Sequence, residues 1–177
     1  TKAMLAHIYE IYGELPYVPK VEALGEAVTP DKDRWDAFQS PLYQVPLRYS
    51  EAPKEAYHMF QLLKMITMQA IGEVNRPYGW DYDPKAMKEV STTARRKTIT
   101  LLKKSKRKKP PKIGDIKSGL TLEEWKVFVD IVIMLIETSL DWSNYWLLDV
   151  NQANVGVDGN GQLILLDIFF DKLAETK

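Results

Sequence analysis

The sequence predicts an α+β fold in which long helices surround a few short strands. Apolar residues recur at helical spacing over residues 2–12, 54–73 and about 122–140. Near the end of the chain, two short apolar runs flank the turn Asp158-Gly159-Asn160-Gly161, which is typical of a β-hairpin. With 177 residues, of which 45% are hydrophobic, the chain is long enough for one domain with a sizeable core.

The composition excludes several classes of site. The chain has no cysteine, which excludes disulfides and thiolate zinc sites, and its two histidines do not favour a histidine metal site. The formal net charge is zero, so the chain as a whole is not built to bind polyanions. The longest apolar run, residues 127–136, contains Asp130 and is too short to span a bilayer, so we expect no membrane contact.

The first third of the chain predicts one helix and two strands. The helix covers residues 2–12, and Gly13 is a plausible stop. Strands are expected at Val18–Leu24 and Leu42–Leu47, with a polar loop around residues 31–34 between them.

The middle of the chain predicts three further helices. Residues 54–73 have a clear apolar face, and a second helix is expected from about Pro84 to Leu102. The sequence Thr121-Leu122-Glu123-Glu124 is a capping-box signature that opens a helix to about Leu140. Because that helix is apolar on most faces, we expect it at the buried centre of the domain.

Three oxygen-bearing residues are grouped around the predicted hairpin. Asp149 precedes it, Asn154 stands at its start and Asp167 at its end. A hairpin returns its second strand beside its first, so Asn154 and Asp167 should lie close together, with Asp149 brought near by the preceding loop. Carboxylate and amide oxygens suit a Mg²⁺–nucleotide site with a nearby base. The alternative is an ordinary hairpin with a surface Asp-Gly turn.

The spacing resembles that of the protein-kinase-like superfamily, in particular short phage-encoded Ser/Thr protein kinases. There a catalytic loop Asp-x-x-x-x-Asn is followed, after a hairpin, by a metal-binding Asp. Asp149 and Asn154 match that loop, and Asp167 follows at the corresponding distance. The resemblance implies a partial N-lobe with part of the small-lobe sheet over residues 1–50, and a mainly helical C-lobe over 51–177.

The resemblance also implies ATP and Mg²⁺ as cofactors. Asp149 would be the catalytic residue, while Asn154 and Asp167 would hold the metal and the nucleotide. The backbone of Gln44, Val45 and Leu47 would approach the hinge and hold the adenine; alternatively this segment is a mere edge strand. The phosphoryl acceptor would be a protein Ser/Thr hydroxyl, and the compartment the cytoplasm, or the host cytoplasm for a phage-encoded chain.

Several positions depart from the kinase pattern. Leu147-Leu148 stands where His-Arg is usual, Asn151 where many Ser/Thr kinases have Lys, and Asp167-Ile168-Phe169 in place of Asp-Phe-Gly. Neither a Gly-x-Gly-x-x-Gly loop nor a Val-Ala-x-Lys strand precedes the first helix. We therefore expect either a fragment of a longer kinase or a degenerate kinase-like module that binds without catalysing. The remaining alternative is an unrelated α+β interaction domain.

A strongly basic segment lies between two of the predicted helices. Ten of the eighteen residues from Arg95 to Lys112 are Lys or Arg. Repulsion between them, together with Pro110 and Pro111, predicts a solvated, mobile loop over about residues 95–117. Its partner would be an acidic protein, an acidic substrate segment or, nonspecifically, nucleic-acid phosphates; the alternative is a solvated insertion with no partner.

Overall fold

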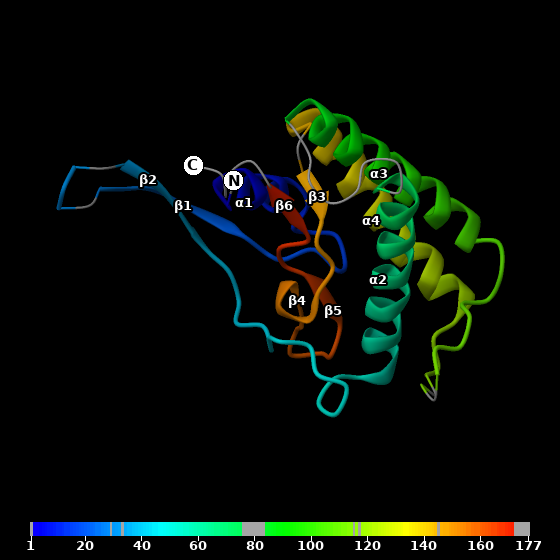
Figure 1. The fold of residues 1–177 in the computed structure, drawn as a ribbon. Helices are drawn as coiled ribbons and strands as arrows, with labels where there is room; N and C mark the ends of the chain where they lie inside the picture. Colours follow the sequence, from blue (N-terminus) through cyan, green and yellow to red (C-terminus); the bar gives the residue numbers. More distant parts are fainter. Residues whose placement is uncertain are drawn as a thin grey trace.

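The computed structural model describes residues 2–28, 30–32, 34–75, 84–114, 116, 118–144 and 146–171. The fold is α+β, as predicted, with helices packed around short antiparallel strands (Figure 1). The elements of the described residues are α1 (Lys2–Tyr12), β1 (Glu22–Val28), β2 (Arg34–Gln39), α2 (Lys54–Asn75), α3 (Pro84–Ser105), α4 (Leu122–Trp142), β3 (Trp146–Leu148), a 3₁₀ turn (Gln152–Asn154), β4 (Val155–Val157), β5 (Leu163–Leu165) and β6 (Phe169–Asp171).

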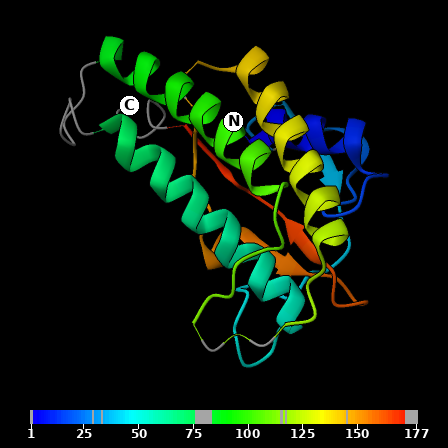
Figure 2. The ribbon, with the colours of Figure 1, turned by 90° about the vertical axis from the view of Figure 1, so that its right-hand side faces the viewer.

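The three long helices α2, α3 and α4 lie side by side on one side of the short strands (Figure 2). All three were predicted, with ends within a few residues of those observed. None of the helices in the described ranges is long and apolar enough to cross a membrane.

Helix α4 begins with the predicted capping box. The Thr121 hydroxyl accepts a hydrogen bond from the Glu124 amide at 3.2 Å, and the Thr121 amide donates to the Glu124 carboxylate at 2.8 Å. The hydrogen bonds from Thr121 hold the pKa of Glu124 below its usual value. Four of the helix's large apolar side chains, Trp125, Phe128, Val132 and Ile136, are buried, which confirms the predicted central position.

The strands of the N-terminal region differ from the prediction. β1 begins at Glu22 and not at Val18, β2 occupies the segment expected to be a polar loop, and residues 42–47 form only a single bridge, between Gln44 and Val157. The β1–β2 hairpin extends away from the body of the molecule (Figure 1), and every residue of β1 is exposed. Because β1 has no buried face, it has no apolar alternation for a pattern to detect.

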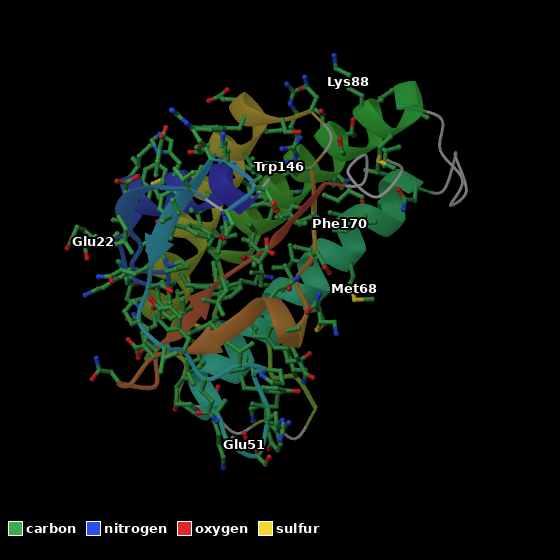
Figure 3. All side chains as sticks on the ribbon, turned by 90° about the vertical axis from the view of Figure 1, so that its left-hand side faces the viewer. Glu22, Glu51, Met68, Lys88, Trp146 and Phe170 are labelled. Atoms are coloured by element: carbon green, nitrogen blue, oxygen red, sulfur yellow. The ribbon has the colours of Figure 1, made fainter. Side chains whose placement is uncertain are left out.

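Two further two-stranded sheets lie under the helices. β4 and β5 form the predicted hairpin, whereas β3 and β6, which pair antiparallel with each other, were not predicted. Trp146 of β3 is almost fully buried, whereas Glu22 and Met68 project from the hairpin and from α2 (Figure 3). A single cluster of buried side chains extends from α1 to β6.

The basic segment is not one loop. Its first part, Arg95 to Ser105, belongs to α3, and Arg95 is 0% exposed. The Arg95 guanidinium donates hydrogen bonds to the carbonyls of Ser139 at 2.8 Å and Ser143 at 2.5 Å, near the end of α4. Burial lowers the pKa of Arg95 to about 10. The number of charges in the segment could not show that Arg95 is buried. Its partners are backbone carbonyls, which leave no acidic residue in the sequence to indicate a pair.

The loop after α3 is anchored to α2. His58 is buried and bonds with one ring nitrogen to the Pro111 carbonyl at 2.8 Å and with the other to the Ser118 hydroxyl at 2.5 Å. The Gly119 amide donates to the Glu55 carboxylate at 3.1 Å. The described part of this loop is therefore attached to α2 at several points, and the predicted loop over residues 95–117 is wrong in its first part, which is helical.

We expect Arg95→Met to lower the free energy of unfolding by about 2–4 kcal/mol, since a buried guanidinium that donates hydrogen bonds to Ser91, Ser139 and Ser143 would be replaced by an apolar group. Urea unfolding measures this change. The matched control is Arg96→Met, because Arg96 is exposed on the same helix, and its effect should stay within about 0.5 kcal/mol. Equal effects of the two variants would contradict a structural role for Arg95.

Candidate functional site

The candidate site lies where one long hairpin is interrupted. β3 pairs with β6 up to Leu148 and Phe169, and β4 pairs with β5 from Val155 and Leu165. Between these two ladders the first strand contributes residues 149–154 and the second only 166–168. Interruptions of this kind bend a strand and re-aim its side chains, and they recur beside active sites.

Backbone hydrogen bonds hold the interruption closed. The Asp149 amide donates to the Ile168 carbonyl at 2.9 Å. The Asn154 carbonyl accepts from the amides of both Leu166 and Asp167, at 3.0 and 3.1 Å. The structure thus brings Asp149, Asn154 and Asp167 together, although they come from two different segments.

The side chain of Asn154 is directed at Asp149. Its amide nitrogen donates to the Asp149 carbonyl at 2.9 Å and to the Asp149 carboxylate at 3.0 Å. The amide oxygen is consequently turned away from Asp149. Both residues are half-buried, so their polar groups remain accessible from one side.

Asn151 has a local structural task. Its side-chain oxygen accepts a hydrogen bond from the Ala153 amide at 2.8 Å and so caps the 3₁₀ turn, and its carbonyl accepts from the Asn154 amide at 3.2 Å. This turn sets the position of Asn154. Asn151 is one of the positions that depart from the kinase pattern, and here it shapes the loop.

A cavity of about 270 Å³ reaches Asp167. Apolar residues line most of it, among them Val21, Phe38 and Leu166, and Tyr9 of α1 forms part of the wall. A neighbouring cavity of about 770 Å³ shares Val21, Gln39 and Ser40 with it and also includes Glu10 and Lys20. We place the site at the smaller cavity, because that cavity contains a carboxylate of the Asp149–Asn154–Asp167 group.

Tyr9 was not singled out in the sequence. It belongs to the apolar pattern of a helix, and its approach to Asp167 spans most of the chain. The side chain is 3% exposed, and its hydroxyl is buried without a well-formed hydrogen bond. Burial raises the pKa of Tyr9 and the negative charge of Asp167 raises it further, while the nearby backbone of Ile168 opposes the rise. Tyr9 and Asp167 therefore line the same cavity, in which the Tyr9 hydroxyl has no hydrogen-bond partner.

The proposed adenine-holding segment is seated on the hairpin. The Gln44 amide and carbonyl both bond to Val157, at 3.0 and 3.2 Å, and the Leu47 amide donates to the Gln152 carbonyl at 3.0 Å. Leu47 is buried, while Val45 is exposed. The segment thus behaves as a short edge strand. The amides of Gln44 and Leu47 are committed to the hairpin, and the adenine contact stays a prediction.

Among the described residues there is no group of three or more His, Cys, Asp or Glu side chains placed to hold a metal ion. A cation at this site would depend on one carboxylate, one amide oxygen and groups from its ligand. No protein-family model, curated protein or solved structure matches the chain. The likeness to kinases therefore remains a prediction, based on Asp149, Asn154 and Asp167.

We expect Gly156→Ala to destabilise the protein by about 1–3 kcal/mol, because a Cβ atom at Gly156 would lie 2.9 Å from the Gln44 carbonyl oxygen and 3.0 Å from Val45 Cγ2. The matched control is Gly159→Ala in the hairpin turn, where a Cβ atom would meet nothing within 4 Å. Urea unfolding compares the two variants. A neutral Gly156→Ala would mean that residues 43–45 are not tightly seated on β4.

Proposed function

We propose that the chain binds Mg²⁺–ATP at the interrupted hairpin and transfers a phosphoryl group to a protein Ser/Thr hydroxyl. The observation that supports this most strongly is the arrangement of the three predicted residues. Asp149 and Asn154 are in direct contact at 3.0 Å, and the Asn154 carbonyl holds the Asp167 amide at 3.1 Å. Two oxygen ligands and a separate carboxylate in one small space are what this reaction requires.

Two of these residues could offer oxygen atoms to a hard cation. Because the Asn154 amide nitrogen is turned to Asp149, the amide oxygen is the atom left to face a metal, and Mg²⁺ prefers oxygen ligands. Asn154 and Asp167 would hold the ion. When bound, the ion would supply charge neutralisation at the nucleotide phosphates.

In this proposal Asp149 contacts the hydroxyl group of the acceptor. It would orient the hydroxyl and take its proton as the new oxygen–phosphorus bond forms and the bond to the nucleoside diphosphate breaks. Asn154 keeps the Asp149 carboxylate in place through a hydrogen bond, and the Ile168 carbonyl fixes the Asp149 backbone. Such transfer depends mainly on positioning and on charge, so Asp149 need not be a strong base.

We expect Mg²⁺-dependent ATP binding by calorimetry, and its loss by at least about 100-fold in Asp167→Ala, since a metal ligand is removed. Asp141→Ala is the matched control, because Asp141 is an exposed aspartate at the end of α4, and binding should be unchanged. No binding by the folded wild-type chain would contradict the proposed function.

Asp149→Asn separates a kinase from a degenerate binding module in the same assay. If Asp149 assists the transfer, the variant should bind Mg²⁺–ATP within a few-fold of the wild type but phosphorylate a protein acceptor about 10²–10⁴ times more slowly. A wild-type chain that binds nucleotide and transfers nothing would be the degenerate module.

A second candidate function is binding of an anionic partner through the basic end of α3 and the loop after it. Lys104, Arg107, Lys108 and Lys109 are exposed there, and the loop is anchored by His58. Anchoring limits the entropy lost on binding. This surface lies on the opposite side of the molecule from the β1–β2 hairpin (Figure 1).

A protein partner would need an apolar patch beside these cations, and exposed Val127 on neighbouring α4 offers little of one. The surface therefore favours nucleic-acid phosphates as its partner. Replacing the four cations by Gln should weaken duplex binding, measured by fluorescence anisotropy, and flatten its log–log salt dependence by about 0.9 per lost phosphate contact. Gln at Arg34, Arg48, Lys54 and Lys88, all exposed, is the matched control. Binding of polyglutamate without duplex binding would identify an acidic protein instead.

A further inference from the structure

Tyr9 is an unusual feature of the core. Most buried hydroxyl groups have a hydrogen-bond partner, because a buried donor without one is costly. The Tyr9 hydroxyl has no well-formed partner, although the ring is almost fully buried. A phenylalanine would fill the same space without this cost, so the hydroxyl is not explained by packing.

The surroundings of the hydroxyl indicate what it is for. Tyr9 and Asp167 line the same cavity, and the Asp167 charge is close enough to disfavour the tyrosinate. The rest of the lining combines apolar residues, among them Val21, Phe38 and Leu166, with the polar residues Gln39 and Ser40. An O–H donor without a partner and a carboxylate therefore line one cavity whose wall is partly apolar.

We propose that Tyr9 is a positioning residue for Asp167: its O–H donates to one carboxylate oxygen when the other oxygen binds the cation. This inference rests on the proposed function, because it assigns a task to a residue behind the metal ligand. Partners behind metal ligands fix the orientation of the ligand, and their loss commonly lowers metal affinity.

The chain offers a matched control on the same helix. Tyr12 also has its ring on α1, but its hydroxyl donates to the Thr138 hydroxyl at 3.1 Å, and Thr138 in turn donates to the Met134 carbonyl at 2.9 Å. The Tyr12 hydroxyl is thus already satisfied within the protein. Tyr9→Phe and Tyr12→Phe each remove one hydroxyl from α1, one beside Asp167 and the other bonded to α4.

The experiment measures ATP binding by calorimetry over a Mg²⁺ series, together with urea unfolding without ligands. We expect Tyr9→Phe to raise the Mg²⁺ concentration at half-saturation by about 10-fold or more, while ATP affinity at saturating Mg²⁺ changes little. Tyr9→Phe should unfold at the same or a higher urea concentration than the wild type. Tyr12→Phe should show the reverse: an unchanged Mg²⁺ dependence and a lower unfolding midpoint.

The outcomes separate this inference from the proposed function. If the wild type binds Mg²⁺–ATP and Tyr9→Phe has the same Mg²⁺ dependence, only the role of Tyr9 is overturned. A destabilised Tyr9→Phe with unchanged Mg²⁺ dependence would show that the hydroxyl is a structural group. If the wild type binds no Mg²⁺–ATP, both proposals fall.

Discussion

The interruption between the two short ladders is the constraint on which the candidate site depends. Asp149 and Asp167 are eighteen residues apart, yet three backbone hydrogen bonds across the gap fix them near Asn154. Each bond contributes only about 0.5–1.5 kcal/mol. Their value lies in geometry, because they fix these residues through the backbone alone. In a regular hairpin the strands would pair continuously through residues 149–154 and 166–168, and alternate side chains of this segment would point into the core.

The packing around the interruption explains why it can persist. Strands β4 and β5 are buried along their whole length, and Ile168, within the interruption, is 0% exposed. Tyr17 lies next to β5, and its carbonyl accepts a hydrogen bond from the Leu165 amide at 2.9 Å. The backbone of Tyr17 has a positive φ of 67°. A non-glycine residue in that conformation costs about 1 kcal/mol or more, which the surrounding core must offset. The loop is thus held by a rigid frame.

Sequence patterns predicted the features that depend on local chemistry. The helices follow from apolar spacing and caps, and the β4–β5 hairpin follows from a turn in which Asp158 bonds to two nearby amides. Strand β1 has no buried face, and β3 and β6 are three residues each and come from segments about twenty residues apart, so these strands leave no periodic signal. Arg95 and Tyr9 were missed for the same reason: the task of each depends on partners far away in sequence.

Residues whose polar groups lower the stability of the fold can indicate where a ligand binds. A buried hydroxyl without a partner at Tyr9 and a half-buried carboxylate at Asp149 are choices that packing does not favour. A residue of similar shape without the polar group would cost less at either position, and both positions lie near Asp167. Among the described residues the Asn75 side-chain oxygen, at the end of α2, is also buried without a partner, whereas Arg95 and His58 are satisfied by carbonyl and hydroxyl partners. Such conflicts are expected where a sequence serves a ligand rather than its own fold. At Tyr9 and Asp149 this argument supports the proposed site at the interrupted hairpin without using the likeness to kinases.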